Sequence, residues 1–308
     1  MSSRPSVAPF GDRLAAAADD RGTPLVLGLD PDPARLWPGG TPADPAASDP
    51  AEAASAAVEE HCLRLVEATA DACVAIKLQL ACFERLGAAG RTAMGNVAAA
   101  AKSAGLLVIA DGKRGDIDVT AEAYAASLFD GHGTPWGHVP GLGADAVTVN
   151  PLMGSDAIAP FLDRARTVGG GIFVLVRTSN PGSADLQEQP LATGEALWER
   201  VAAQVAALDD GRGALADAGA VCGATAPGRV TALRDLLPRG PFLLPGVGAQ
   251  GGTVDGLAAA FRPGLGGGLV TVSRTVARAH ETTGGDPATA ARAAAIELRD
   301  ACRRTAAR

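Results

Sequence analysis

Residues 106–117 read LLVIADGKRGDI, an apolar run that ends in a cluster of charges. Five apolar residues in succession, Leu106–Ala110, are typical of a parallel strand that is buried on both faces. Two acids, two bases and two glycines follow within the next six residues. Charge is costly to bury unless it is paired, so charges at the point where a strand leaves the core predict an active site. A solvated charged turn is the alternative.

Seven further short apolar runs alternate with Ala-rich stretches of helical character. These additional predicted strands are Leu25–Leu29, Cys73–Leu78, Ala144–Val149, Ile172–Val176, Gly219–Cys222, Pro241–Leu244 and Gly268–Val272. The predicted helices include Glu52–Thr69, Thr120–Phe129, Glu195–Leu208, Val230–Leu236 and Ala288–Arg303. Eight alternations without a break in composition predict one (β/α)8 barrel domain over residues 1–308, in preference to two doubly wound α/β domains. Gly/Pro-rich segments near 38–50 and 131–143 are predicted to be surface insertions.

Composition limits the classes of function. The chain of 308 residues is 47% hydrophobic and 20% charged, which is ordinary for a soluble protein with a large core. A net charge of -7 and an aromatic content of 4% disfavour nucleic-acid binding. The sequence has no signal-peptide or membrane-span pattern, so we expect a cytoplasmic protein. The five cysteines form no CxxC pair and the four histidines no HExxH motif, so no disulfide framework and no metal site are predicted.

In a (β/α)8 barrel the chemistry lies at the carboxyl ends of the strands. Nearly every predicted strand in this sequence is followed there by a polar or glycine-rich element. In chain order these elements are Asp30, Lys77, Asp111 with Lys113 and Asp116, Asn150, RTSN at 177–180, GAT at 223–225, PGVGAQGG at 245–252 and Ser273-Arg274. Because the strand interiors are apolar, this regular placement predicts one active site that gathers residues from many strands.

The sequence GVGAQG at 246–251 matches the G-x-G-x-x-G pattern of dinucleotide sites. It follows the seventh predicted strand, whereas a Rossmann fingerprint follows the first and is joined by an acidic residue about 20 positions later. The next strand end offers Arg274 instead. Loops after strands 7 and 8 are the usual phosphate site of such barrels, so we expect Gly251, Gly252 and Arg274 to hold a single phosphate, with Gln250 as a further donor. Glycines that only form tight turns are the alternative.

Lys77, Asp111, Lys113 and Asp116 are expected to form an alternating array of charges. Each lysine would stay protonated because carboxylates flank it, and each carboxylate would stay ionised for the same reason. Asp111 and Lys113 lie two positions apart, so on an extended backbone both can face the same side. Lys113 could then act as a general acid. A Schiff-base lysine needs a lowered pKa, which flanking acids oppose.

Residues 111–117, DGKRGDI, followed by Thr120, resemble the D-x-K-x-x-D-I signature of the orotidine 5′-phosphate decarboxylase family. The resemblance extends over most of the chain, in the order that the family shows. It includes LGLD at 27–30, Ile76-Lys77 with Phe83-Glu84, Asn150-Pro151, TSNPG at 178–182, PGVGAQGG at 245–252 and Ser273-Arg274. The chain length and the TSNPG segment resemble the larger bacterial subgroup of this family.

The resemblance implies a cofactor-free and metal-free (β/α)8 homodimer that converts orotidine 5′-phosphate to uridine 5′-phosphate in pyrimidine synthesis. Lys113 would protonate the pyrimidine carbon that loses CO2, and Asp111 would lie beside the substrate carboxylate. Asp116 and Thr120 would reach across the dimer interface into the neighbouring site. The other implied contacts are those of Asp30 and Lys77 with the ribose, of Ser179 with the pyrimidine, and of Gln250 and Arg274 with the phosphate.

The chemistry of the residues agrees with this implied reaction. Loss of CO2 from the ring leaves an electron pair that no neighbouring carbonyl readily absorbs, and no motif suggests thiamine, pyridoxal or a metal as an electron sink. A fixed cation at the developing carbanion and binding energy from a remote phosphate remain as the means of catalysis.

Two other hypotheses remain open at the level of sequence. The D-x-K-x-x-D core also occurs in sugar-phosphate decarboxylases and synthases, and a magnesium-dependent enzyme of that kind would need further acidic ligands, for which Glu84 could serve. A catalytically silent barrel that binds a nucleotide as a regulator is the second hypothesis. The Ser179 segment and Gln250 fit a nucleotide better than a sugar phosphate, and the clustered charges favour catalysis over binding alone.

Overall fold

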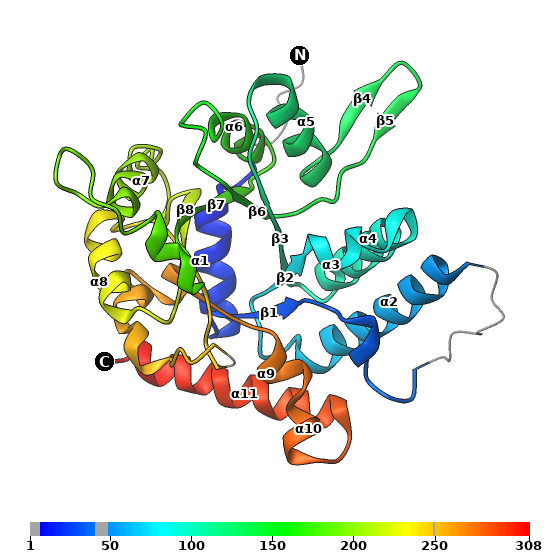
Figure 1. The fold of residues 1–308 in the computed structure, drawn as a ribbon. Coiled ribbons are helices and arrows are strands. Elements are labelled where there is room, and N and C mark those ends of the chain that lie inside the picture. The colour runs from blue at the N-terminus through cyan, green and yellow to red at the C-terminus, as the bar shows by residue number, and fades with distance from the viewer. Residues whose placement is uncertain (1–6, 41–48, 249) are drawn as a thin grey trace.

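The computed structural model describes residues 7–40, 49–248 and 250–308, and within them eight parallel strands close into a barrel (Figure 1). In order around the barrel they are β1 (Leu25–Leu29), β2 (Ala75–Gln79), β3 (Leu107–Arg114), β6 (Ala146–Val149), β7 (Gly171–Arg177), β8 (Ala218–Cys222), β9 (Phe242–Pro245) and β10 (Gly268–Val272). Strand β10 pairs back with β1, which closes the sheet. The predicted (β/α)8 barrel is therefore confirmed.

All eight apolar runs identified in the sequence form strands of the barrel. Strands β1 and β10 have the predicted bounds. The largest difference is at β3, which was expected to end at Ala110 and continues to Arg114. Its pairing with β6 is interrupted by a bulge and resumes at Arg114, which pairs with Val149. Asp111, Lys113 and Arg114 are thus part of the strand, whereas Asp116 follows it.

Helices cover the outside of the barrel and connect successive strands (Figure 1). They are α2 (Pro50–Thr69), α3 (Leu80–Glu84), α4 (Gly87–Ser103), α5 (Asp118–Leu128), α6 (Ala159–Thr167), α7 (Leu197–Ala206), α8 (Pro227–Leu236), α9 (Arg274–Ala277), α10 (Ala279–Thr283) and α11 (Pro287–Ala306). Two of these helices, α2 and α11, begin with proline after an aspartate whose side chain accepts a backbone hydrogen bond. No helix in the described part of the chain is both long and apolar enough to span a membrane.

The connection between β9 and β10 departs from the regular alternation. Instead of an α-helix, the described residues there form the 3-10 turns η3 (Asp255–Phe261) and η4 (Leu265–Gly267). Further 3-10 turns occur after β1, as η1 (Pro33–Arg35), and after β7, as η2 (Pro181–Asp185). The sequence RPGLGGG at 262–268 explains the shortened connection after β9, because proline and glycine disfavour a continued α-helix.

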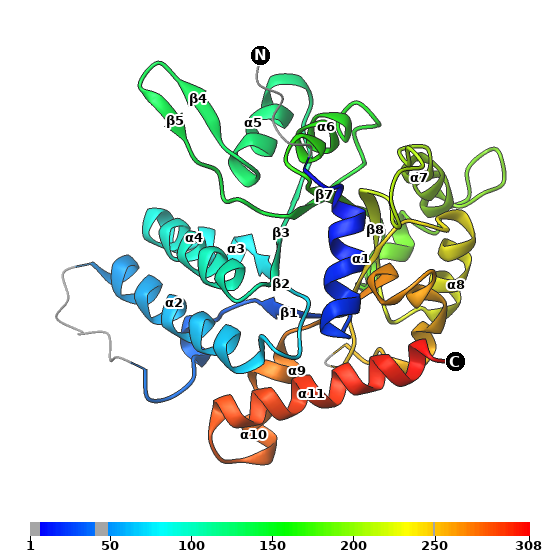
Figure 2. The ribbon, with the colours of Figure 1, turned by 180° about the vertical axis from the view of Figure 1, so that it is seen from behind.

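The interior of the barrel is closed at the amino-terminal end by α1 (Phe10–Arg21), which the sequence analysis did not predict. Figure 2 shows this helix lying against the barrel. Phe10 and Leu14 are fully buried and belong to one cluster with the inward-facing residues of the strands. The Phe10 and Phe173 rings meet edge to face at 6.0 Å. A second, larger cluster fills the space between the strands and the outer helices.

The two segments predicted as surface insertions differ in how far the structure describes them. Most of the segment near 38–50 lies outside the described residues, which omit 41–48. The segment 131–143 contains an antiparallel hairpin of β4 (His132–Thr134) and β5 (Gly137–Val139), which extends away from the barrel near α5 (Figure 1). Trp136, in the turn of this hairpin, is 92% exposed.

Candidate active site

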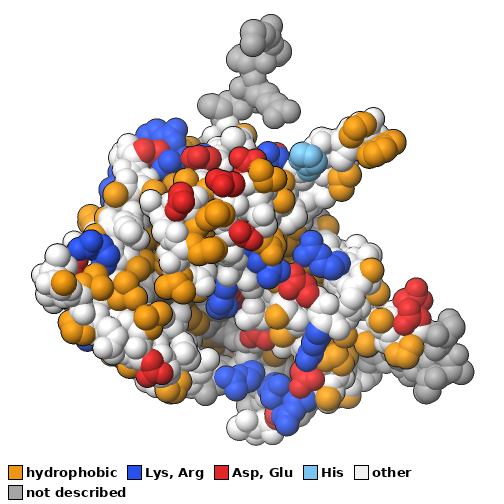
Figure 3. Space-filling view, turned by 45° about the horizontal axis from the view of Figure 1, so that its top comes forward, with side chains coloured by type: hydrophobic (Ala, Val, Ile, Leu, Met, Phe, Trp, Pro, Cys, Tyr) orange, Lys and Arg blue, Asp and Glu red, His pale blue; other side chains and the backbone are white. Residues whose placement is uncertain are grey.

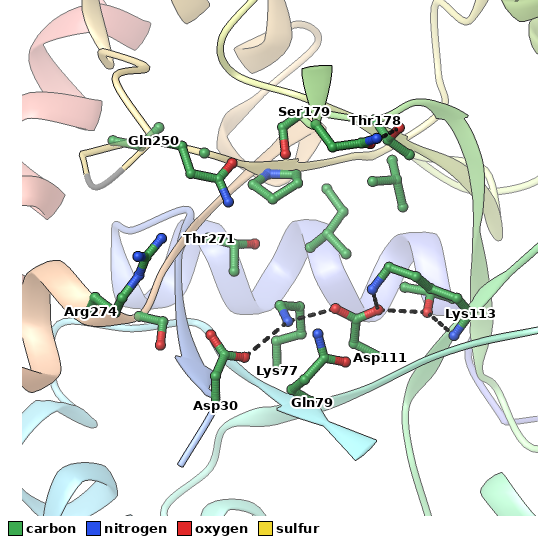
Figure 4. A pocket seen from close by; sticks show the side chains of 18 of the residues that line it. Asp30, Lys77, Gln79, Asp111, Lys113, Thr178, Ser179, Gln250, Thr271 and Arg274 are labelled. Atoms are coloured by element: carbon green, nitrogen blue, oxygen red, sulfur yellow. Dashed lines mark hydrogen bonds and ion pairs between the residues drawn. The ribbon is translucent and has the colours of Figure 1, made fainter. Parts of the chain in front are cut away.

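A cavity of about 390 Å³ opens at the carboxyl ends of the barrel strands. It brings together most of the residues predicted for the site, which Figure 4 shows pointing toward a common space. These are Asp30, Lys77, Asp111, Lys113, Ser179, Gln250 and Arg274. In the space-filling view, acidic and basic side chains gather around a hollow on this face of the molecule (Figure 3). The prediction that many strands contribute to one cavity is therefore confirmed.

A continuous row of alternating charges crosses one side of the cavity (Figure 4). Lys77 Nζ lies 3.7 Å from Asp30 Oδ1 and 2.6 Å from Asp111 Oδ2. The other carboxylate oxygen of Asp111, Oδ1, lies 2.6 Å from Lys113 Nζ. The Lys77 and Asp111 side chains are only 7% and 8% exposed, whereas the Lys113 side chain is 45% exposed. Lys113 is therefore the lysine of the row that a ligand in the cavity can approach most directly.

The pairing in this row fixes the charge of its buried members. Burial alone would raise the pKa of Asp111, but attraction to Lys77 and Lys113 outweighs burial and lowers that pKa to about 2. Burial would also lower the pKa of Lys77, yet the nearby carboxylates of Asp111 and Asp30 raise it above its usual value. Both groups are charged at neutral pH, so the cavity holds fixed charges in alternating order.

The backbone that presents Lys113 is not the extended strand that the spacing suggested. Lys113 has a φ of +48°, in the left-handed region that residues with a Cβ seldom adopt. It lies within the β3 bulge, so its side chain meets Asp111 through a local kink and not through simple alternation. A left-handed residue other than glycine costs about 1–2 kcal/mol, which the surrounding contacts must offset.

Thr148 on β6 provides part of that support and was missed in the sequence analysis. Its hydroxyl accepts a hydrogen bond from the Lys113 backbone N–H at 2.9 Å and donates one to Asp111 Oδ1, also at 2.9 Å. One buried side chain thus fixes both the kinked backbone and the carboxylate between the lysines. The available signal was an inward-facing hydroxyl on the strand next to β3, but threonine is also a common strand residue and did not stand out.

The residue after Lys113 points in another direction and anchors the bulge from outside. Arg114 forms an ion pair with Glu84 of α3, and its guanidinium lies 5.4 Å from the centroid of the Tyr124 ring on α5. Glu84 also pairs with Arg91, at 3.6 Å. Glu84 is therefore engaged with arginines outside the cavity, and it is not among the residues that line it.

The end of the cavity opposite Lys113 carries the candidate phosphate site (Figure 4). Gln250, Ser273, Arg274 and Thr275 line it, and no ion pair within the described ranges involves Arg274. Gly251 and Gly252 are not among the lining residues. Their backbone N–H groups donate to loop carbonyls, at 2.8 Å and 3.0 Å, so in this conformation these amides do not point at the cavity as the sequence analysis expected.

The segment after β7 places Ser179 over the cavity and is held by its own polar contacts. Gln187 Oε1 accepts from the Thr178 backbone N–H at 2.8 Å, and Gln187 Nε2 donates to the Thr178 hydroxyl at 3.0 Å. Glu188 bridges two arginines, Arg177 at 2.6 Å and Arg229 at 2.7 Å. Arg177, Thr178 and Ser179 were identified from the sequence as a polar strand end, whereas Gln187, Glu188 and Arg229 were not.

Close packing under Ser179 also explains a glycine at the end of β8. A Cβ at Gly223 would lie 2.8 Å from the Ser179 Cβ, which is closer than such atoms approach. The glycine therefore allows the Ser179 segment to cross close above β8.

Asp116 and Thr120 lie outside the cavity of their own chain. Asp116 Oδ1 accepts a hydrogen bond from the Ile117 backbone N–H at 2.9 Å, and Thr120 is exposed on α5. The array expected from the sequence ended with Asp116, but in the single chain Asp30 forms the end of the row instead. Within the described ranges, no three His, Cys, Asp or Glu side chains are grouped closely enough to hold a metal ion.

The fold and the site together define a (β/α)8-barrel protein in which a row of alternating charges and the residues after β9 and β10 line one cavity at the carboxyl ends of the strands. A family model described as "Orotidine 5'-phosphate decarboxylase / HUMPS family" matches residues 23–294. The chain therefore belongs to the orotidine 5′-phosphate decarboxylase / HUMPS family.

Individual relatives agree with this membership. The chain is 44% identical to an orotidine 5′-phosphate decarboxylase of Deinococcus radiodurans over 249 residues, covering 80% of this chain and 85% of the relative. A solved structure of a candidate orotidine 5′-phosphate decarboxylase from Streptomyces avermitilis has a TM-score of 0.80 and 33% identity, and the match covers 100% of this chain and 99% of that one. The Leishmania donovani OMP decarboxylase structure has a TM-score of 0.74 and 34% identity, with 96% and 98% covered.

Proposed function

We propose that this protein is an orotidine 5′-phosphate decarboxylase, which converts orotidine 5′-phosphate to uridine 5′-phosphate and CO2 in pyrimidine nucleotide synthesis. Family membership supports this proposal, as does the sequence identity to relatives that carry this name. The observation that carries it furthest is the row Asp30–Lys77–Asp111–Lys113, which lines the same cavity as Arg274. Such a site suits a substrate that has an anion at one end and a reacting carboxylate at the other.

The proposed binding mode follows the distribution of charge around the cavity. Arg274 and Gln250 hold the 5′-phosphate, since a guanidinium and an amide are both donors to phosphate oxygens. Asp30 and Lys77 contact the ribose hydroxyls, and Ser179 hydrogen-bonds the pyrimidine. Gly251 was expected to assist with the phosphate, and this requires its N–H to exchange its present partner in the loop for a phosphate oxygen.

The proposed chemical step needs no electron-accepting cofactor. The bond between the ring carbon and the carboxylate breaks, and CO2 leaves while its bonding electron pair stays on the ring carbon. Lys113 Nζ donates a proton to that carbon, and the lysine regains a proton from solvent. The ammonium group is fixed by its 2.6 Å contact with Asp111, so it stabilises negative charge where that charge develops.

Asp111 has a second proposed role, because it would lie beside the substrate carboxylate. Two unit negative charges about 4 Å apart repel each other by roughly 4 kcal/mol at an effective dielectric constant near 20. The two neighbouring lysines offset part of this repulsion in the bound state. Departure of CO2 removes the repulsion, so the buried carboxylate favours the step that breaks the bond.

We further propose that the active form is a homodimer in which each subunit supplies Asp116 and Thr120 to the site of the other. Neither residue lines the cavity of its own chain. Apolar side chains surround them on the surface, with Ile117 45% and Val119 78% exposed. Exposed apolar residues beside polar side chains that do not reach the cavity of their own chain favour a contact with a second copy.

The test is the loss of ultraviolet absorbance of orotidine 5′-phosphate on addition of the purified protein, with and without EDTA. We expect rapid loss that EDTA does not change. Lack of turnover by folded protein would overturn the proposal and direct attention to sugar-phosphate substrates with magnesium. Turnover that EDTA abolishes would overturn the metal-free mechanism while leaving the substrate assignment intact.

A further inference from the structure

Thr271 on β10 carries a buried hydroxyl that no described residue satisfies. The residue is 6% exposed, and its Oγ1 has no hydrogen-bond partner within the described part of the chain. A buried polar atom without a partner costs about 1–3 kcal/mol, so it needs an explanation. Thr271 also lines the active-site cavity, and Figure 4 shows its side chain pointing into it.

The two strands next to β10 around the barrel, β1 and β2, carry a glycine and a buried lysine. Thr271 is opposite Val26 of β1, and two positions further along β1 is Gly28, which is paired with Lys77 of β2. A Cβ at Gly28 would come within 3.0 Å of the Ser273 Cβ, so the packing of β1 against β10 favours glycine there.

We propose that the Thr271 hydroxyl is a further substrate-binding group, which hydrogen-bonds an oxygen of the ribose 5′-phosphate portion of the nucleotide. This inference rests on the proposed function. The side of the cavity on which Thr271 lies determines which portion of the substrate it contacts. Thr271 is on β10, which Ser273 and Arg274 follow directly, and two strands, β1 and β2, separate it from Asp111 on β3. It therefore lies nearer the phosphate end than the end at which CO2 is lost.

This position predicts opposite effects of one substitution on stability and on binding. Thr271→Val keeps the shape of the side chain and removes the hydroxyl. In the free protein the hydroxyl has no protein partner, so its loss leaves the melting temperature equal or higher. In the complex a hydrogen bond disappears, so uridine 5′-phosphate binds about five- to tenfold more weakly and KM for the substrate rises by a similar factor. A residue with only a structural role would not give this pair of changes.

The matched control is Thr305→Val on α11. Thr305 is 1% exposed, and its Oγ1 likewise lacks a partner among the described residues, but it is far from the cavity lining. We expect the same effect on stability and no effect on catalysis. A second pair of variants separates the hydroxyl from the methyl group. Thr271→Ser loses only the methyl group, whereas Thr271→Ala loses both groups. We expect the alanine variant to bind uridine 5′-phosphate more weakly than the serine variant.

The measurements are the melting temperature, the steady-state kcat and KM, and the dissociation constant of uridine 5′-phosphate. If wild-type protein has no decarboxylase activity, the proposed function fails and the inference fails with it. If wild-type protein is active and Thr271→Val binds uridine 5′-phosphate within twofold of wild type, only the inference about Thr271 is overturned. Equal affinity of the serine and alanine variants would overturn it as well.

Discussion

Lys77 Nζ lies 2.6 Å from Asp111 Oδ2, and each of these side chains is less than one tenth exposed. Removing two charges from water is costly, so this contact is maintained by partners on both sides. Asp30 lies on the far side of Lys77, and Lys113 lies on the far side of Asp111. The row is therefore an electrostatic unit, in which each of the two buried charges is paired with an opposite charge on both sides.

The first prediction concerns stability in acid. The pKa of Asp111 in the folded protein is lowered to about 2, below its value of about 3.9 in an unfolded chain. A depressed carboxyl pKa stabilises the folded state above the unfolded pKa, and this contribution is lost as the pH falls from about 4 through about 2. The shift corresponds to about 2–3 kcal/mol in the free energy of unfolding.

Denaturant unfolding of wild type and Asp111→Asn, from about pH 6 down to about pH 2, measures this contribution. The variant is less stable at neutral pH because Lys77 keeps only the 3.7 Å contact with Asp30. Its stability also declines less steeply below about pH 4, because the asparagine does not titrate. Parallel declines in the two proteins would contradict the assignment of a low pKa to Asp111.

The second prediction concerns Thr148, which touches both Asp111 and the backbone of Lys113. Thr148→Val removes both hydrogen bonds, so we expect Asp111 and Lys113 to lose their mutual alignment. We expect kcat to fall about tenfold, equivalent to about 1.4 kcal/mol, with a smaller change in KM because the phosphate contacts remain. Thr148→Ser keeps the hydroxyl and serves as the control. Equal and unimpaired kcat values in both variants would argue against a positioning role.

The third prediction separates chemistry from binding at Lys113. We expect Lys113→Ala to reduce kcat by a factor of about a thousand or more, because a fixed proton donor is lost. Uridine 5′-phosphate has no carboxylate and is held mainly at the other end of the cavity, so its dissociation constant should change only a few-fold. Lys102→Ala, at an exposed position on α4, is the control for loss of a lysine. Near-normal turnover by Lys113→Ala would eliminate it as the proton donor.

The fourth prediction tests whether two chains share a site. In a mixed dimer of Asp116→Ala and Arg274→Ala subunits, one site carries neither substitution and the other carries both. Random mixing of two inactive variants should therefore restore about a quarter of the wild-type activity, since half of the dimers are mixed and each of these has one intact site.

The matched control for this experiment mixes Arg274→Ala with Lys113→Ala. These two residues belong to the cavity of the same chain, so every site in the mixed dimer carries one of the two defects. No recovery is expected. Verified mixed dimers of the Asp116 and Arg274 variants that remain as inactive as this control would contradict a shared site.

The strands were predictable from sequence because a parallel barrel buries both faces of each strand. Leu25–Leu29 is buried at all five positions and was located at its observed bounds. The end of β3 was not predictable in the same way. The bulge at Lys113 depends on a hydrogen bond to Thr148, which lies 35 positions further along the chain. A contact of that kind leaves no local pattern in the sequence.

The identities of the site residues were predictable from the sequence, but not all of their positions relative to one another were. Strand ends placed Lys77, Asp111 and Lys113 together correctly, since parallel strands bring their carboxyl ends to one rim. Asp116 was grouped with them because it is near in sequence, yet the chain turns outward after the bulge and carries it away from the cavity. For Asp116, closeness in sequence to Lys113 did not predict its position relative to the cavity of its own chain.

The helix α1 determines by which end of the barrel ligands can enter and leave. Phe10 and Leu14 stop the amino-terminal end, and Val221 and Leu243 form the apolar floor of the cavity above it. Under the proposed reaction, the nucleotide and the released CO2 must then leave through the same opening, at the carboxyl ends of the strands. CO2 leaves either past the bound nucleotide or after it. Any movement of the Ser179 segment that widens the opening therefore governs the release of both products.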